Sequence, residues 1–367
     1  MERLKPSISG SSEEKDPQGE FLISPLPAER LAGIEWMRGV AVFGVICIHS
    51  GLAVHNRTTP AAATLRAIFS FAVPFFLVLS FFFAVRAEKE GWLSWSLWMK
   101  KRAGRLLIPF VFWSSLYLAL HGIKLVAYHQ IDQIKALFAN PAGLVMSGGT
   151  SLALYFLPLL FTGLILIHLF SPLFQRFSSW MLIFAFLMAL GAREFCYHAG
   201  FDDGMIPTAQ GGAWFHLVSD LMEDGLRCCP LIFAAGLLER HLPVPESQNA
   251  YPLLGAGFSL LVIAYFIGLP EGLTELLLGI GAFLLAWELS AFMAPGHWAI
   301  VVGCFSFGVY LVHQVFLELI EILFPSRGLA GVIESLAITI VVYAFSMLSV
   351  GLASRGSGLV RRIFGFR

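Results

Sequence analysis

The segment from Glu35 to Ser50, EWMRGVAVFGVICIHS, places an arginine and a histidine eleven residues apart in a nearly apolar run. An α-helix turns 100° per residue, so this spacing amounts to about three full turns and roughly 16 Å along the axis. Arg38 and His49 therefore share one face of one helix. Residues 34–54 are long enough to span a bilayer, with Arg38 near one surface and His49 deep in the hydrocarbon layer. An ionisable side chain at that depth is costly and indicates a functional site.

The composition and the apolar runs predict a membrane protein. Of the 367 residues, 57% are hydrophobic and only 13% are charged, which lies outside the usual range of soluble domains. We therefore predict an all-α fold, a polytopic transmembrane bundle of about ten spanning helices. The apolar runs cover residues 33–54, 63–85, 105–124, 151–174, 178–192, 219–238, 252–269, 273–293, 298–324 and 330–353.

The distribution of Lys and Arg predicts the orientation of the chain and its division into parts. Positive charge collects before the first run, after the second run and at the C-terminus, so both termini are expected in the cytoplasm. Residues 1–30 are polar and lack the features of a signal peptide, which predicts a disordered cytoplasmic tail. Residues 31–355 form the predicted membrane domain, and residues 356–367 a basic cytoplasmic tail.

Charge and cysteine content argue against two other classes of protein. The formal net charge is zero, so bulk charge indicates no nucleic-acid partner. The five cysteines lie mostly in apolar runs and form no CxxC pair, and no histidine cluster has metal-ligand spacing. We expect no metal site.

Further along the chain, short motifs follow the first run in a fixed order. They are FAVPFFLVLSFFF at 71–83, KKRAGRLLIPF at 100–110, LYFLPLLF at 154–161 and FSFGVYLVHQVF at 305–316. With Glu35, Arg38 and His49, this ordered set resembles the acyltransferase-3 family of integral membrane O-acyltransferases. The chain departs from the family pattern in having Glu35 in place of the usual aspartate. It also has Phe81 after Ser80, where the family usually has glycine.

The resemblance implies an enzyme that moves an acyl group, most often acetyl, from cytoplasmic acyl-CoA to a hydroxyl. The acceptor would be a cell-surface glycan or a lipid-linked sugar, and the protein would lie in the cytoplasmic membrane of a bacterium. Acetyl-CoA would act as a donor substrate, with no permanently bound cofactor. The sequence leaves the oligomeric state open.

The first helix offers three candidate catalytic residues. A neutral imidazole at His49 could take the proton of the acceptor hydroxyl, although a buried histidine can also serve packing alone. Arg38 could hold the donor or the developing oxyanion, and Glu35 at i, i+3 could fix its direction. Arg38 could instead be an interfacial anchor that obeys the positive-inside rule.

Arg102 and Arg105 are candidates for binding the donor. They lie three residues apart at the start of the third apolar run, so they share a helix face and could form a fork for the CoA phosphates. The alternative is that they only set the topology, which is our interpretation of Lys100 and Lys101.

A second polar stripe lies on the ninth run, where Ser306, Tyr310 and His313 follow spacings of four and three. If it faces the first helix, the bundle interior holds His313 as a further catalytic candidate, with Ser306 and Tyr310 as donor contacts. Hydrogen bonding between helices is the structural alternative for Ser306 and Tyr310.

Carboxylates near the other ends of the helices, including Glu275, could bind a sugar together with Tyr155 or Trp214, or could form local ion pairs such as Glu223 with Arg227.

A different class of protein also fits the buried polar residues. A transporter or exporter of a polar molecule or glycan would need the same polar path through the bundle. A structural subunit of a glycan-export complex is a third hypothesis.

Overall fold

The computed structural model describes residues 31–53, 60–90, 94–127, 129, 154–198, 213–243, 250–293, 296–323 and 332–366. These residues form helices and no strand, which confirms the all-α prediction. The predicted tail at 1–30 lies outside the described residues.

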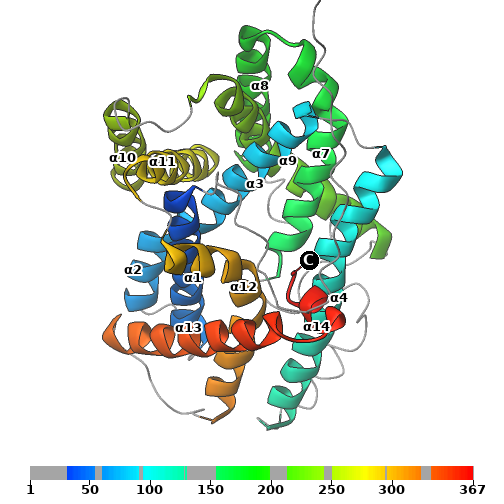
Figure 1. Cartoon of the computed structure of the whole chain (residues 1–367), viewed down its shortest axis with the longest axis vertical. Helices are drawn as coiled ribbons and strands as arrows, with labels where there is room; N and C mark the ends of the chain where they lie inside the picture. Colours follow the sequence, from blue (N-terminus) through cyan, green and yellow to red (C-terminus); the bar gives the residue numbers. More distant parts are fainter. Residues whose placement is uncertain are drawn as a thin grey trace, which may run out of the picture. The chain divides into compact units, whose positions relative to one another are not determined.

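Where the structure describes the chain, every predicted apolar run overlaps one helix, except that the run at 63–85 overlaps two (Figure 1). In the described part of the chain, eight helical spans are long and apolar enough to cross a membrane, which confirms the polytopic bundle. The other two runs fall on α10, which has 17 residues, and on α9, which carries four charged residues between 220 and 227. The helices are α1 (Ala32–Ala53), α2 (Pro60–Phe69), α3 (Ala72–Glu90), α4 (Trp95–Ala127), α7 (Phe156–Arg176), α8 (Ser179–His198), α9 (Ala213–His241), α10 (Ala250–Phe266), α11 (Glu271–Phe292), α12 (His297–Leu323), α13 (Val332–Ser354) and α14 (Gly358–Ile363).

The run predicted as one helix at 63–85 is broken into α2 and α3. Pro74 has no N–H to donate to the carbonyl of Ser70, and its ring would clash with that carbonyl in a continuous helix. Pro74 instead lies in the first turn of α3, where proline is tolerated. The Ser70 hydroxyl turns back to the Ala67 carbonyl at 2.8 Å and closes the end of α2.

The helix α4 extends well beyond the run predicted at 105–124. Hydropathy excluded its first turns because they carry Lys100, Lys101 and Arg102. Those residues are nevertheless good helix formers, and the helix continues through them. Arg102 and Arg105 consequently lie in the second and third turns of α4 rather than at the start of a helix.

The first helix is the centre of the bundle. It packs against α2, α3, α11, α12 and α13, with α12 beside it along much of its length (Figure 1). Small residues allow these approaches: a Cβ at Gly303 of α12 would lie 2.7 Å from Cβ of Glu35. A Cβ at Gly33 would lie 2.6 Å from the backbone nitrogen of Ser290 on α11. Close backbone approach is how helices associate in lipid, where the hydrophobic effect between helices is weak.

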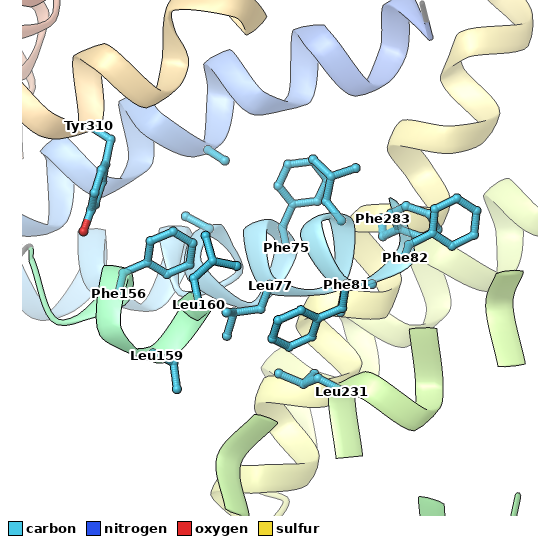
Figure 2. Packing of buried hydrophobic residues seen from close by; sticks show 14 of the residues in the cluster. Phe75, Leu77, Phe81, Phe82, Phe156, Leu159, Leu160, Leu231, Phe283 and Tyr310 are labelled. Carbon is cyan, nitrogen blue, oxygen red and sulfur yellow. The ribbon is translucent and has the colours of Figure 1, made fainter. Parts of the chain in front are cut away.

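The apolar core is built around α3, whose phenylalanines point to several neighbours (Figure 2). Phe82 contacts Phe283 of α11 with ring centroids 4.9 Å apart. Phe81 is fully buried and its ring occupies the space that a side chain at Gly163 of α7 would need. The glycine expected after Ser80 is therefore replaced by a large ring that fits against a glycine on the opposite helix.

The segment after α13 packs onto the bundle. The indole nitrogen of Trp113 on α4 donates to the Ile363 carbonyl at 3.0 Å, and the ring of Phe364 meets Trp113 edge-on at 5.3 Å. Gly365 has a positive φ of 76° and its α-carbon faces the ring of Phe307. The cytoplasmic location of this end stays a prediction.

Gly33→Ala should destabilise the protein by about 1–3 kcal/mol, because the new methyl would press on rigid backbone atoms of α11. Gly191→Ala on α8 is the matched control, since a Cβ there meets nothing within 4 Å. Thermal unfolding of the detergent-purified variants measures the difference. Equal midpoints for the two variants would contradict the close contact between α1 and α11.

Candidate functional site

Two histidines from different ends of the sequence meet inside the bundle. The rings of His49 on α1 and His313 on α12 have centroids 5.7 Å apart and are tilted by 37°. His313 is fully buried, and His49 is half-buried. The polar stripe predicted on the ninth run thus faces the first helix at the level of His313, which is the condition for a shared site.

The hydrogen bonds of His313 are asymmetric. Its Nδ1 lies 2.6 Å from the backbone carbonyl oxygen of Tyr310, one turn earlier on α12. Its Nε2 is buried and has no hydrogen-bond partner among the residues that the structure describes. Buried polar atoms nearly always have a partner. Among the described residues, Nε2 shares this state with a few other buried atoms, such as Ser114 Oγ and Gln314 Oε1, but it belongs to the imidazole that meets His49.

The side chains of Tyr310 and Ser306 make different kinds of contact. The Tyr310 ring contacts Phe156 of α7 edge-on at 5.6 Å (Figure 2). It lies 6.1 Å from the His313 ring. The Ser306 hydroxyl donates to the Gly303 carbonyl of its own helix at 2.7 Å. This bond lies within α12 and is not the hydrogen bond between helices that was the structural alternative for Ser306. The Tyr310 ring forms part of the wall around His313.

Glu35 and Arg38 form the ion pair that their spacing predicted. Nη1 of Arg38 lies 3.1 Å from Oε2 of Glu35, with 25% of the arginine side chain and 12% of the glutamate side chain exposed. Gly303 of α12 lies against Glu35, so the carboxylate is confined between the two helices. Arg38 is therefore held in one direction, three helical turns from His49.

Arg102 and Arg105 lie on α4, which packs against α7, α12 and α14. Arg102 is half-buried and Arg105 is exposed. Arg102 follows Trp98 by four residues and so shares its face, which is buried against α7. The described polar contacts between α4 and α12 lie further along α4 than these two arginines, at Tyr117 and Lys124.

Polar contacts join α4 to α12, and the sequence analysis does not predict them. The Tyr117 hydroxyl donates to the Leu311 carbonyl, and Lys124 pairs with Glu318, at 3.2 Å, and with Glu321. Lys124 is the last residue of the run predicted at 105–124, and α4 continues past it to Ala127. The spacing of seven residues between Tyr117 and Lys124 was the available signal.

Glu275 is the centre of an ion-pair cluster rather than an isolated sugar-binding carboxylate. Its Oε1 accepts from Nη2 of Arg227 at 2.8 Å, and Oε2 accepts from Arg193. The Arg227 guanidinium also lies over the Tyr155 ring, 5.8 Å from its centroid. The cluster joins α8, α9 and α11, so Glu275 forms ion pairs between helices, and Arg227, expected to pair with Glu223, contacts Glu275.

Glu88 and His168 form another buried pair that no sequence pattern indicated. Oε2 of Glu88 lies 3.0 Å from Nδ1 of His168, and the Trp98 ring stacks on the imidazole at 4.8 Å. The three residues come from α3, α7 and α4, so only the fold brings them together. Within the described ranges, no group of three or more His, Cys, Asp or Glu residues could hold a metal ion.

Removing the Glu35 carboxylate should destabilise the protein through its effect on Arg38. Glu35→Gln leaves a partly buried guanidinium without its ion-pair partner, so we expect a loss of about 1–3 kcal/mol in stability. Glu35→Asp keeps a carboxylate three residues before Arg38 and should recover most of that loss. Glu334→Gln on the exposed surface of α13 is the control. The stability is measured by thermal unfolding. An unfolding midpoint of Glu35→Asp that is no higher than that of Glu35→Gln would contradict a stabilising role of the Glu35–Arg38 ion pair.

Comparison with known proteins agrees with the resemblance noted in the sequence. No curated protein and no solved structure gives a significant match. A family profile described as an acyltransferase domain, that of the acyltransferase-3 family, matches residues 31–353. This range includes both histidines, the Glu35–Arg38 pair and the arginines of α4. The chain is a membrane protein that belongs to the acyltransferase-3 family.

Proposed function

We propose that this acyltransferase moves an acetyl group from cytoplasmic acetyl-CoA to a hydroxyl of a cell-surface glycan or a lipid-linked sugar. The observation that carries the proposal is the meeting of His49 and His313 inside the bundle. A reaction between a thioester and a hydroxyl needs a base for the hydroxyl proton, and this pair is the candidate. The bacterial cytoplasmic membrane, with both termini in the cytoplasm, is the proposed location.

The anionic donor needs cations. Arg38, directed by Glu35, and the fork of Arg102 and Arg105 on α4 are the proposed contacts for the CoA phosphates, since guanidinium groups bind phosphate in a bidentate way. Tyr310, in the wall around His313, is a further proposed donor contact. Ser306 is the weakest of the predicted donor contacts because its hydroxyl hydrogen is already used within α12.

In the proposed reaction, the acceptor oxygen attacks the thioester carbonyl carbon while its proton passes to an imidazole. The carbon–sulfur bond then breaks, the sulfur receives a proton, and free CoA leaves together with an acetyl ester. Holding both substrates beside the histidine pair would supply much of the rate enhancement through proximity. The environment away from water would strengthen the electrostatic contribution of the site.

His49→Ala should abolish the acetyl ester of the surface glycan. Cells that lack this chain are complemented with the intact protein, with His49→Ala, or with His241→Ala as a control at an exposed histidine. All variants are adjusted to the same membrane level, and the ester content is measured after alkaline release. We expect ester from the intact protein and the control, and at least a hundredfold less from His49→Ala.

Two other results would contradict this account. Full ester content with His49→Ala would give that histidine a structural role only. An ester content that does not depend on the chain, together with altered movement of a glycan or small polar molecule, would favour the transporter hypothesis.

A further inference from the structure

We propose that His313 is the residue that takes the proton from the acceptor hydroxyl, through its Nε2 atom. This inference rests on the proposed function and adds a division of roles within the histidine pair. The opening motif of the chain draws attention to His49, but the hydrogen bonds of the folded protein distinguish the two imidazoles.

The contact between His313 and the Tyr310 carbonyl fixes the tautomer of the ring. A carbonyl oxygen can only accept a hydrogen bond, so the Nδ1 atom at 2.6 Å must carry the hydrogen. In the neutral imidazole, Nε2 is then left with its lone pair and no hydrogen. The Tyr310 carbonyl of α12 thus orients the His313 ring and determines which nitrogen is basic. In many catalytic histidines a carboxylate has this role.

The position of Nε2 supports a role toward a substrate. His313 is fully buried, and among the described residues nothing donates a hydrogen bond to this nitrogen. Leaving a buried acceptor unsatisfied costs free energy, and a hydroxyl group that enters the site would remove that cost. An acceptor sugar supplies such a hydroxyl, and its proton would point at a nitrogen that is ready to receive it.

The other buried histidine of the described chain shows the contrast. In His168 the Nδ1 atom contacts Glu88 at 3.0 Å, and the ring is covered by Trp98. That arrangement ties three helices together and presents no open nitrogen of the kind seen in His313. His49 lies 5.7 Å from His313 as the second imidazole, on the α1 face that also carries Arg38.

The proposed step balances as follows. The acceptor O–H bond breaks as oxygen bonds to the thioester carbonyl carbon, and Nε2 of His313 receives the proton. As the carbon–sulfur bond breaks, the resulting imidazolium returns a proton to the departing sulfur. The products are the acetyl ester, free CoA and neutral His313, so the step needs no further reactant.

Two substitutions separate catalysis from packing. His313→Asn puts an amide N–H near the position of Nδ1, so it can keep the bond to the Tyr310 carbonyl while nothing occupies the position of Nε2. His313→Gln puts an amide near the position of Nε2, where it can form a hydrogen bond but cannot take a proton. His241→Asn makes the same change at an exposed histidine and serves as the control.

The assay uses inside-out membrane vesicles from cells that lack the native chain and express one variant each. The acceptor is the one that these membranes contain. Acetyl-CoA labelled in the acetyl group is added, and both CoA thiol release and alkali-labile label in the glycan fraction are followed. Folding is checked by membrane level and by the elution profile of the purified protein in detergent. We expect both His313 variants to lose at least a hundredfold in rate at normal protein levels, with the control unchanged.

Three results would overturn the inference, each in a distinct way. Near-normal turnover by His313→Asn would mean that the ring serves only the bond within α12. Near-normal turnover by His313→Gln would mean that Nε2 is a hydrogen-bond acceptor but no base. Absence of CoA thiol release from the intact protein would contradict the proposed function itself. Thiol release and glycan label of the intact protein show this result before the variants are compared.

Discussion

The close approach of α1 and α12 is the constraint on which the rest of this structure depends. In an apolar surrounding the hydrophobic effect gives little reason for two helices to associate, so small residues and polar contacts decide which helices pack together. Gly303 allows α12 to lie against Glu35, and Gly39 leaves room for Val302. This contact confines the Glu35 carboxylate beside Arg38 and, three turns along α1, brings His49 to His313.

The polar residues in the bundle fall into two kinds. Glu275 with Arg193 and Arg227, Lys124 with Glu318 and Glu321, and Glu88 with His168 are paired with one another and connect helices. The pair of His49 and His313 is different, because two imidazoles meet there, and Nε2 of His313 is buried without a partner among the described residues. Paired groups stabilise the arrangement of the helices, whereas an unpaired buried group needs another explanation, and we propose that a substrate hydroxyl supplies it.

The sequence predicted the helical bundle because long apolar runs allow few other structures, and the spacing of Arg38 and His49 placed them on one face. It could not predict the break before α3, where one proline divides an unbroken apolar run, or the length of α4, whose first turns are basic. The motif in α12 indicated His313, but its open Nε2 depends on a bond to the Tyr310 backbone. Pairs such as Glu88 with His168 come from separate helices with no repeating pattern, so only the folded chain reveals them.

The central claim is that His49 and His313 work as one unit, and a double-mutant cycle on turnover tests it most directly. The rates of acetyl-CoA consumption are measured for the intact protein, for His49→Ala, for His313→Asn and for the double variant, all at the same membrane level. Residues that act together give strongly non-additive losses, so the account predicts that the double variant is about as slow as the slower single variant. Losses that multiply across the two substitutions would show that the histidines act independently and would contradict the account.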